Sequence, residues 1–404
     1  MVTSSYPRFP GDAVATFMEP IAHGLAARGH QIHVVAPWHP RWRRAAAEGD
    51  VRFHLFRYAP TAALNVFGYA AALRADVRLR ASAVAAAPLA VFAGWRLARR
   101  VIREIGASIV HAHWVVPGGV IGAAAAGARP LVISLHGSDV FVAERHRLVG
   151  TAARSAFRRA SWVAACSTDL AERAAALGAD AGRLTVVPYG VDTERFGPDE
   201  AARSAVRGRL GVPDDAPLVV AVGRLVRKKG FEYLIEAAAR LKKDHPALHL
   251  VVAGEGDLAA PLRAQAASAG IAGRVHFLGT VPHQDVPALL AAADVAAVPS
   301  VHDEAGNVDG LPNTVMEILA SGTPLVATPV GGIGAVATDR LTARLVPERD
   351  AGALAAAIAD LLRDPSARAA IGRQAREMMR REHGWARTAD AYDAIYQRVG
   401  GRER

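Results

Sequence analysis

Residues Leu218 to Phe231 read Leu-Val-Val-Ala-Val-Gly-Arg-Leu-Val-Arg-Lys-Lys-Gly-Phe, and this stretch decides the fold. Its first five residues form a short apolar run, which is typical of a buried strand in a parallel sheet. A glycine-flanked loop with Arg224 and Lys229 follows and leads into a helix. The N–H groups at the start of that helix add positive potential. The stretch therefore predicts a strand, a loop able to hold a diphosphate, and a helix.

Two common phosphate-binding loops do not fit this stretch. A Walker A loop requires Gly-Lys followed by Ser or Thr, and a dinucleotide fingerprint requires Gly-x-Gly-x-x-Gly. Neither pattern occurs between Gly223 and Gly230. Taken alone, the basic residues of the loop are equally consistent with a solvated charge cluster, and both interpretations stay open at this point.

Short apolar runs alternate with helical segments on both sides of this stretch, which indicates buried parallel sheets. In the first half we expect strands at 31–36, 51–56, 108–111, 130–135, 162–166 and 184–187, and helices at 13–28, 90–105, 118–126 and 168–177. In the second half we expect strands at 218–222, 248–253, 275–278, 295–298 and 324–327, helices at 231–243, 258–269, 286–292 and 314–320, and further helix at 365–399.

The alternation pauses at 189–217, which is rich in Gly, Pro and Asp. We therefore predict an α/β protein with two Rossmann-like domains whose parallel sheets face each other across a cleft, where ligands bind. The expected domains are 1–196 and 217–384, joined by a linker at 197–216, with a helix at 385–400 that packs back on the first domain. Because the first five residues read like the end of a strand, we expect a few residues of a first strand to be absent from this sequence.

Composition narrows the class of protein. Of the 404 residues 51% are apolar, enough for large cores, and the single cysteine, Cys166, excludes an internal disulfide and fits a reducing compartment. We expect no membrane span, because no charge-free apolar run reaches the length of about 18 residues that spanning requires. Arg8, Asp12 and nearby prolines interrupt any signal-peptide core.

The net charge of +10 lies in one half of the sequence. Residues 1–197 contain 23 Arg against 13 Asp and Glu, whereas the remainder contains 25 basic and 25 acidic residues. A one-sided basic half indicates an anionic partner such as a membrane surface or a phosphorylated acceptor. The source genome's base composition explains the excess of Arg over Lys but not the asymmetry. No recognition motif supports nucleic acid as the partner.

Segment 61–103 is rich in alanine and arginine, with Asp76 as its single acid and apolar residues such as Phe92 and Trp95 between the arginines. A basic amphipathic helix or helical hairpin of this kind can lie on an anionic bilayer. The alternative is an ordinary pair of surface helices packed on the sheet. The burial of Phe92 and Trp95 distinguishes the two.

A second group of candidate residues lies at 309–317, Asp-Gly-Leu-Pro-Asn-Thr-Val-Met-Glu. Asp309 lies in a Gly/Pro loop and Glu317 lies inside the helix that follows. The loop carboxylate can accept hydrogen bonds from sugar hydroxyls, and the helix carboxylate can bind both hydroxyls of a ribose. In isolation, a favourable charge at a helix start and an ordinary helix salt bridge are the better explanations of the two acids.

Short motifs along most of the chain occur in one order, which is far more specific than any one of them. The motifs are Ser4-Ser5-Tyr6-Pro7 with Gly11, Arg28-Gly29-His30, His111-Ala112-His113-Trp114, Ser134-Leu135-His136-Gly137-Ser138-Asp139, Val187-Pro188-Tyr189-Gly190-Val191-Asp192, Gly223 to Phe231, Gly254-Glu255-Gly256, Phe277-Leu278-Gly279 and Asp309 to Gly322. Their order and spacing resemble the retaining glycosyltransferases of family 4, which have the GT-B fold.

The resemblance implies a role for each matching residue. Arg224 and Lys229 would hold the donor diphosphate, Glu317 the ribose, and Asp309 the donor sugar, which His136 would contact near the reaction centre. His136, Arg224, Lys229 and Asp309 are thus the predicted catalytic set. Further donor contacts are expected at Gly11, Gly223, Thr280, Val281, Gly310, Leu311, Asn313 and Thr314, and acceptor-side contacts at Tyr6, His113 and Asp139.

Three positions depart from the family pattern. Asp309 stands where glutamate is commoner and is one methylene shorter. Pro312 has no N–H where the family often has glycine, so phosphate must be bound by its neighbours. Asp12 follows Gly11 where a second glycine is common, which leaves one unobstructed approach of the backbone to the diphosphate.

The resemblance also implies partners. The donor is a nucleotide-diphosphate sugar, which is a substrate, so we expect no cofactor. The acceptor is expected to be a glycan or glycolipid precursor at the cytoplasmic face of the membrane. Since no Asp-x-Asp occurs, we predict no metal, although His111 and His113 could also be read as zinc ligands. The alternatives are a nucleotide-sugar epimerase or hydrolase without an acceptor, and a non-catalytic binding protein.

Overall fold

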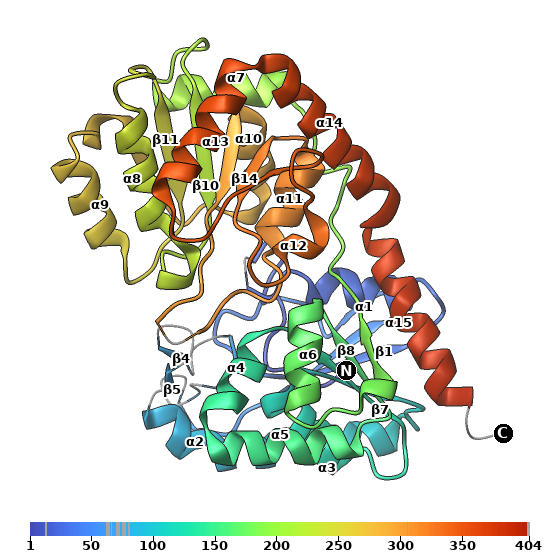
Figure 1. Ribbon diagram of the computed structural model, residues 1–404. Helices are drawn as coiled ribbons and strands as arrows, with labels where there is room; N and C mark the ends of the chain where they lie inside the picture. Colours follow the sequence, from blue (N-terminus) through green and yellow to red (C-terminus); the bar gives the residue numbers. More distant parts are fainter. Residues whose placement is uncertain are drawn as a thin grey trace. The chain divides into compact units, whose positions relative to one another are not determined.

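The computed structural model describes residues 1–12, 14–61, 65, 67–69, 73–74, 78–79, 81–304 and 306–401 (Figure 1). It divides into two compact units. Unit 1 comprises Met1–Tyr189 and Trp385–Arg404, and unit 2 comprises Gly190–Gly384. The segment from 385 onward thus belongs with the first unit.

The predicted linker at 197–216 is wrong, because it contains helix α7, Glu200–Leu210, which belongs to unit 2. The helix is fixed by its arginines. Arg203 and Arg207 both form ion pairs with Asp294, at 2.8 and 3.4 Å, and the side chain of Arg207 is only 1% exposed. The polar composition of this stretch therefore reflects buried ion pairs rather than a flexible connection.

Unit 2 contains a single parallel sheet in the order β12-β11-β10-β13-β14-β15. The strands are β10 Leu218–Val222, β11 His249–Ala253, β12 Val275–Gly279, β13 Val295–Val298, β14 Leu325–Ala327 and β15 Arg344–Leu345. The order reverses between β10 and β13, which are paired at the centre. In open α/β sheets this reversal is the point where ligands bind, beyond the carboxyl ends of the strands.

Helices cover both faces of this sheet (Figure 1). Besides α7 they are α8 Phe231–Leu241, α9 Ala259–Ser268, α10 Val286–Ala292, α11 Asn313–Ser321, α12 Ile333–Val336, α13 Ala351–Arg363 and α14 Pro365–Glu382. Helix α8 buries Phe231, Leu234, Ile235, Ala238 and Leu241, a spacing of three and four residues that places one apolar stripe against the core. The sequence analysis did not predict α7, α12, α13 or β15.

Besides a short two-stranded pair, the described residues of unit 1 form two sets of strands, in the orders β1-β3-β2 and β6-β7-β8-β9. Their bounds are β1 Ile32–Pro37, β2 Ala47–Glu48, β3 Val51–Phe56, β6 Val110–His113, β7 Leu131–Leu135, β8 Trp162–Ala165 and β9 Leu184–Val186. Within these two sets, all pairs are parallel except β2 with β3. Val2 forms parallel bridges to both Val35 and Ala112, so the first residues occupy a strand position between the two sets. A cavity of about 310 Å³ lies beside this position, lined by Met1, His33 and Ile109 among others.

The helices of unit 1 are α1 Met18–Ala26, α2 Ala81–Glu104, α3 Val120–Ala125, α4 Ser138–Arg145, α5 Arg147–Arg159, α6 Thr168–Ala176 and α15 Trp385–Gly400. In the described part of the predicted basic segment α2 is the only helix, and β4 Leu73–Arg74 pairs with β5 Arg78–Leu79, so these residues do not form a helical hairpin. Asp76, also assigned to this segment, lies outside the described residues.

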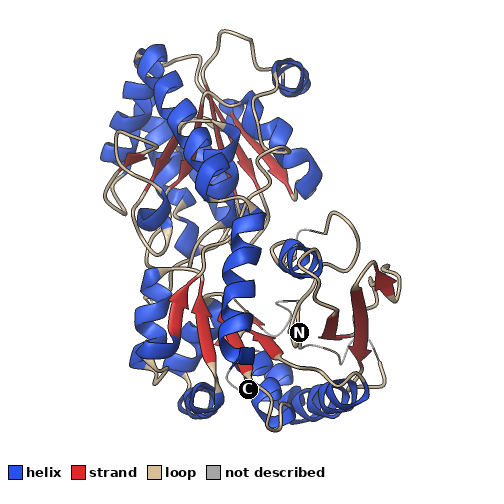
Figure 2. Cartoon of the chain, turned by 90° about the vertical axis from the view of Figure 1, so that its right-hand side faces the viewer, coloured by secondary structure: helices blue, strands red, loops and turns tan. Residues whose placement is uncertain are grey.

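Helix α15 packs against α1 and the strands of unit 1 (Figure 2), as the prediction of a returning C-terminal helix requires. The hydroxyl of Tyr396 lies 2.7 Å from Nδ1 of His111, and that of Tyr392 lies 3.0 Å from the hydroxyl of Ser134. Asp393 bonds His30 at 2.6 Å. Buried polar contacts therefore tie residues almost 300 positions apart.

Candidate functional site

The loop after β10 has the form that the sequence predicts. Gly223 ends the strand, Arg224 is exposed, and a 3₁₀ turn, Arg227–Lys229, leads to α8. Gly230 has a φ of +64°, and a Cβ there would lie 1.9 Å from the carbonyl oxygen of Pro299. Only glycine fits, so Gly230 fixes the point at which α8 begins.

Two lysines of this loop converge on one carboxylate. The ammonium groups of Lys228 and Lys229 lie 2.9 and 2.7 Å from the two carboxylate oxygens of Asp309. All three side chains are 14% exposed or less. Burial alone would raise the pKa of Asp309, but the two ammonium groups outweigh it and hold the pKa below its usual range.

The main chain of Asp309 packs closely against a second glycine, Gly331. Gly331 has a φ of +56°, and a Cβ on it would lie 2.0 Å from the carbonyl oxygen of Asp309. The loops after β10 and β13 therefore meet beyond the two central strands, at the reversal of strand order.

Helix α11 begins at Asn313 directly after this loop. Gly310 and Leu311 are buried, Asn313 and Thr314 are half-buried, and the helix start has no side-chain cap. An uncapped N-terminus next to lysines is well suited to an anion. Pro312 lacks the N–H that a glycine would supply there.

Glu317 lies one turn inside α11, and its carboxylate is bonded to another side chain. Its carboxylate accepts a hydrogen bond from Nε2 of His283 at 2.8 Å, and both side chains are mostly buried. His283 comes from the loop after β12, which also contains the predicted contacts Thr280 and Val281. Thr280 is exposed and Val281 is half-buried.

A cavity of about 310 Å³ lies beside the β10 loop in unit 2. Its lining includes Leu225 from that loop and Gly279 at the end of β12. Phe277 is also part of it, with the guanidinium of Arg263 4.6 Å from its ring centroid. The cavity therefore offers an apolar floor and a cation between the two loops.

In unit 1 the predicted residue His136 follows β7 and is part of a stacked group. Its ring centroid lies 4.5 Å from that of Phe17, and its two nitrogens contact Tyr189 and His113. Burial lowers the pKa of His136 to about 3, so its imidazole is neutral at physiological pH. Gly11, with a φ of +82°, is exposed in the loop before α1, where Asp12 is bonded by Arg8 at 2.6 Å.

The three acceptor-side candidates are buried inside unit 1. Tyr6 and His113 have no exposed surface, and Asp139 is 4% exposed. The carboxylate of Asp139 accepts hydrogen bonds from the main-chain N–H groups of Val115, His136 and Gly137. In the structure these side chains are buried and contact their neighbours, and their expected contact with an acceptor stays a prediction.

Three residues that contact the predicted site residues were not predicted from the sequence. They are Lys228, His283 and Tyr189. Lys228 is adjacent to Lys229 in the sequence. When two lysines are neighbours, one is expected to bind the ligand and the other to be solvated. Tyr189 was quoted as part of a family motif without a role. No sequence signal marks His283, because it reaches Glu317 across 34 residues.

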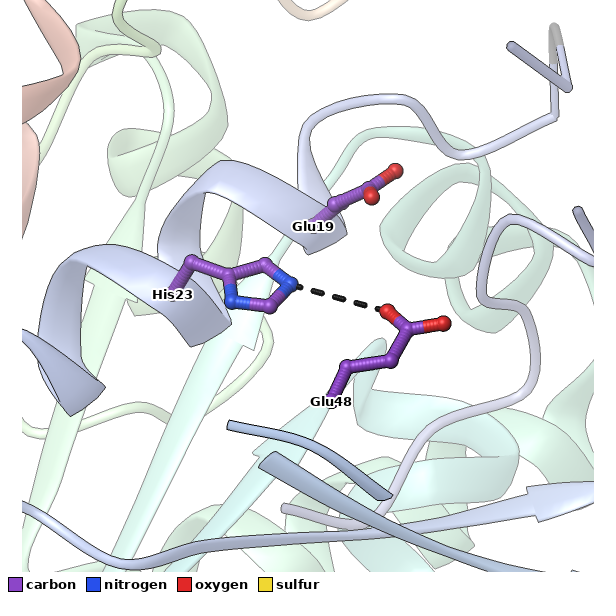
Figure 3. A group of neighbouring side chains, drawn as sticks. All are labelled: Glu19, His23 and Glu48. Atoms are coloured by element: carbon purple, nitrogen blue, oxygen red, sulfur yellow. Dashed lines mark ion pairs between the residues drawn. The ribbon is translucent and has the colours of Figure 1, made fainter. Parts of the chain in front are cut away.

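Glu19, His23 and Glu48 are the one group among the described residues whose acid and histidine atoms are close enough to hold a metal ion (Figure 3). However, both carboxylates already bond the guanidinium of Arg44, at 2.7 and 2.6 Å. The side chain of Arg44 is 1% exposed, so a metal would be placed beside a buried cation. The group therefore reads as an ion-pair cluster that ties α1 to β2.

His111 and His113 do not form a zinc site in the described structure. Both nitrogens of His111 contact hydroxyl groups, those of Tyr396 and Ser134, each at 2.7 Å. Nδ1 of His113 bonds His136. Only Nε2 of His113 has no partner among the described residues.

The outer face of α2 divides into an apolar and a basic half. Val84, Leu89 and Phe92 are each 56–59% exposed, and Arg96, Arg99, Arg100 and Arg103 follow along the same side. Trp95 is half-buried, with its indole N–H bonded to the carbonyl of Ala124 at 3.2 Å. No described helix is long and apolar enough to span a membrane.

Two family models match the chain. Residues 14–195 match Glycosyltransferase Family 4, and residues 202–378 match Glycosyl transferases group 1. Together the two matches cover most of both units.

Curated relatives agree with these matches. A GDP-mannose-dependent α-(1-6)-phosphatidylinositol monomannoside mannosyltransferase of Mycolicibacterium smegmatis is 36% identical over 286 residues, which cover 68% of this chain and 73% of the relative. A 2-deoxystreptamine glucosyltransferase of Streptomyces kanamyceticus is 31% identical over 321 residues, covering 75% and 80%. Such relatives transfer sugars, which supports neither the epimerase nor the hydrolase alternative.

Solved structures show the fold. A sucrose-phosphate synthase from Thermosynechococcus elongatus aligns with a TM-score of 0.80 at 21% identity over 99% of both chains. Anabaena HepE in complex with UDP-glucose aligns with a TM-score of 0.76 at 21% identity, again over 99% of both. This chain is therefore a GT-B-fold glycosyltransferase and belongs to glycosyltransferase family 4.

Proposed function

We propose that this enzyme transfers a sugar, with retention at the anomeric carbon, from a nucleotide-diphosphate sugar to a hydroxyl group of a lipid-linked or cell-surface glycan precursor. The observation that carries the proposal is the cluster in unit 2, where Lys228 and Lys229 meet Asp309 beside Arg224 and the uncapped start of α11. Cations and helix N–H groups in this arrangement fit a diphosphate.

The proposed reaction needs no protein nucleophile. The bond from the anomeric carbon to the diphosphate oxygen breaks while the acceptor oxygen bonds to the same face of that carbon. The acceptor proton passes to an oxygen of the leaving diphosphate. Negative charge grows on that group, so the part of the protein is electrostatic, through Arg224, Lys229 and the N–H groups of Asn313 and Thr314.

In this scheme the carboxylate of Asp309 exchanges one of its two lysine partners for the donor sugar. In the structure its carboxylate neutralises Lys228 and Lys229. A donor diphosphate would compete for Lys229 and leave Asp309 on Lys228, from where it could accept hydrogen bonds from the sugar. Glu317, now bonded to His283, would bind the ribose in the same way.

The cavity beside the β10 loop is the proposed place of the nucleotide base. It is bounded by Gly279, next to the expected contacts Thr280 and Val281. The name of the mycobacterial relative mentions GDP-mannose, and HepE was solved with UDP-glucose. These two nucleotide sugars are therefore tested first as donors. We further propose that transfer is independent of metal, because lysines and helix N–H groups occupy the place of a cation.

The acceptor is proposed to be presented at the cytoplasmic face of an anionic membrane. The support is the outer face of α2, where exposed Val84, Leu89 and Phe92 are followed by exposed arginines. Apolar side chains can enter the headgroup region while arginines bind lipid phosphates.

The decisive experiment is a thermal-shift panel of UDP, GDP, ADP and dTDP on the wild type and the Arg224→Ala variant. A ligand at 100 times its Kd adds about 2.7 kcal/mol to the unfolding free energy. At roughly 2–4 °C per kcal/mol the shift is easily measured. A nucleotide that shifts the wild type and not the variant supports the assignment, and the matching donor is then assayed for transfer with and without EDTA. No shift with any nucleotide, or activity lost in EDTA and restored by Mg²⁺, would contradict the corresponding part of the proposal.

A further inference from the structure

The imidazole of His136 is held at both of its nitrogens by side chains of unit 1. The hydroxyl of Tyr189 lies 2.7 Å from Nδ1, and Nδ1 of His113 lies 3.1 Å from Nε2. The ring of Phe17 stacks on the imidazole with 4.5 Å between centroids. The ring therefore cannot turn without breaking two hydrogen bonds and a stacking contact.

Both partners of His136 are themselves fixed by the core. His113 is the last residue of β6, has no exposed surface, and donates its main-chain N–H to the carbonyl of Val2 at 2.8 Å. Tyr189 is 5% exposed, and its ring stacks on Phe17 at 4.7 Å. The positions of the two hydrogen-bonding atoms are thus set by β6 and by the core of unit 1.

The hydrogen bonds leave two ways to place the protons. In one, the hydroxyl of Tyr189 donates to His136, and Nε2–H of His136 donates to His113, whose own Nε2–H is then buried without a partner. In the other, His113 donates to Nε2 of His136, and Nδ1–H of His136 donates to the hydroxyl oxygen of Tyr189. In both placements His136 is neutral and each of its nitrogens is used in a hydrogen bond within unit 1, so the ring is fixed in either case.

We propose that Tyr189 and His113 are positioning residues that lock His136 in one neutral form, with both nitrogens hydrogen-bonded within unit 1. This inference rests on the proposed transferase function and deepens it. A nitrogen bonded within the protein is not available to remove a proton from an acceptor hydroxyl. His136 thus offers the donor sugar its main chain and the edge of a fixed ring, and the acceptor proton goes to the leaving phosphate.

The geometry can be tested without any substrate. In protein labelled with ¹⁵N-histidine, long-range ¹H–¹⁵N NMR distinguishes a protonated Nδ1 from a protonated Nε2, and a His136→Gln variant identifies the signals of His136. We expect a single neutral tautomer in the wild type at pH 7, and a mixture in Tyr189→Phe. A charged or freely exchanging His136, or unchanged signals in Tyr189→Phe, would overturn the inference.

Tyr396→Phe is the matched control. It removes the same hydroxyl group from a buried tyrosine of unit 1, but one that bonds His111 instead of His136. The His136 signals and the turnover of this variant are expected to match the wild type. If Tyr396→Phe disturbs His136 as much as Tyr189→Phe does, general loosening of unit 1 explains both, and the positioning role fails.

Kinetics separate positioning from folding. Tyr189→Phe and His113→Leu are each expected to lower kcat about 10- to 100-fold, the usual cost of a misplaced group, with the donor KM changed less than about threefold. His113→Asn keeps an N–H donor near Nδ1 and is expected to restore most of the loss. Equal losses in His113→Leu and His113→Asn, or normal turnover in Tyr189→Phe, would contradict the role. Absence of transfer in the wild type would instead refute the proposed function, whereas the NMR result would still stand.

Discussion

The predicted catalytic residue of unit 1 is neutral, whereas those of unit 2 are charged. In unit 1, His136 is neutral and packed among Phe17, Tyr189 and His113, although residues 1–197 hold the entire net charge of the chain. In unit 2, which comes from the half with no net charge, Lys228 and Lys229 are concentrated around Asp309. The charge of a half of the sequence therefore does not indicate where an anion binds, because surface arginines dominate the sum.

The difference suggests a division of labour between charge and position. Unit 2 pairs Lys228 and Lys229 with its own carboxylate, Asp309, and the proposed diphosphate would compete for these cations. Unit 1 holds a neutral ring in place through hydrogen bonds and stacking. Variants that remove charge should therefore act strongly in unit 2, and variants that remove single hydroxyl groups should act in unit 1.

The largest expected effect is on the cations of unit 2. Arg224→Ala and Lys229→Ala should each lower kcat/KM about 10²–10³-fold, because each removes charge that stabilises the leaving diphosphate. Lys243→Ala, an exposed lysine at the end of α8, is the control and should have normal kcat/KM. Near-normal turnover of either site variant would remove it from the proposed catalytic set.

The next effect concerns the ion pairs of Asp309. Asp309→Asn leaves two mostly buried ammonium groups without their counter-charge, which should lower the unfolding free energy on the order of 3 kcal/mol. Pyrophosphate should raise the Tm of this variant more than that of the wild type, since an anion replaces the lost carboxylate. A variant as stable as the wild type, or one that ignores pyrophosphate, would show that the cluster is not an anion site. Exposed Asp285→Asn serves as the control.

Much of this arrangement could be predicted from the sequence, and the limit has a physical cause. Strands 218–222 and 295–298 were predicted at their observed bounds, because buried parallel strands are continuous apolar runs, which here end before Gly223 and Pro299. Lys229 and Asp309 were predicted as site residues because loops after such strands carry ligand contacts, and the structure brings these two together. Helices α4 and α5 were missed, and α7 was taken for a linker, because their many polar residues resemble loops.

Contacts made across long stretches of chain left no trace in the sequence. Glu317 bonding His283 and His136 bonding Tyr189 depend on which loops meet, and no local pattern reports that. The burial of Tyr6, His113 and Asp139 could not be predicted for a related reason. A polar residue in a motif can serve the core as well as the surface, and burial distinguishes the two.

Acid should affect unit 1 first. Burial depresses the pKa values of His111 and His113 well below 6.5 and that of His136 to about 3. The unfolded chain binds protons at these positions below about pH 6.5, so stability is complete above that pH and falls as pH drops toward the folded pKa values, by up to about 1.4 kcal/mol per pH unit for each group.

The acid sensitivity of unit 2 should appear at lower pH. The pKa of Asp309 is lowered in the folded chain, so the stability that its ion pairs contribute is complete above about pH 4, the ordinary value of an aspartate, and is lost as the pH falls from there toward the lower folded value. Hydrogen exchange read by peptide between pH 7 and 4 should therefore show loss of protection in β6 and β7 before the β10 loop. Simultaneous loss, or loss in the β10 loop first, would contradict the comparison.

The smallest expected effect is on the exposed face of α2. Phe92→Ser should change the unfolding free energy by less than about 0.5 kcal/mol, because this ring is 58% exposed. It should nevertheless reduce sedimentation with phosphatidylglycerol vesicles, and phosphatidylcholine vesicles should bind neither protein. Leu341→Ser, at a 50% exposed leucine of unit 2, is the matched control and should bind like the wild type. Equal binding of Phe92→Ser would locate any membrane contact elsewhere.

The return of α15 to unit 1 also bears on how the protein is made. Tyr392 and Tyr396, which close the buried side of β6 and β7, are synthesised only after the 195 residues of Gly190–Gly384. At about 5–20 residues per second, a ribosome needs roughly 10–40 s to supply them. Through this interval the first 189 residues wait with His111 and Ser134 uncovered, while unit 2 can fold as soon as it emerges. The segment made first thus belongs to the unit completed last, and chaperones would meet it in that interval.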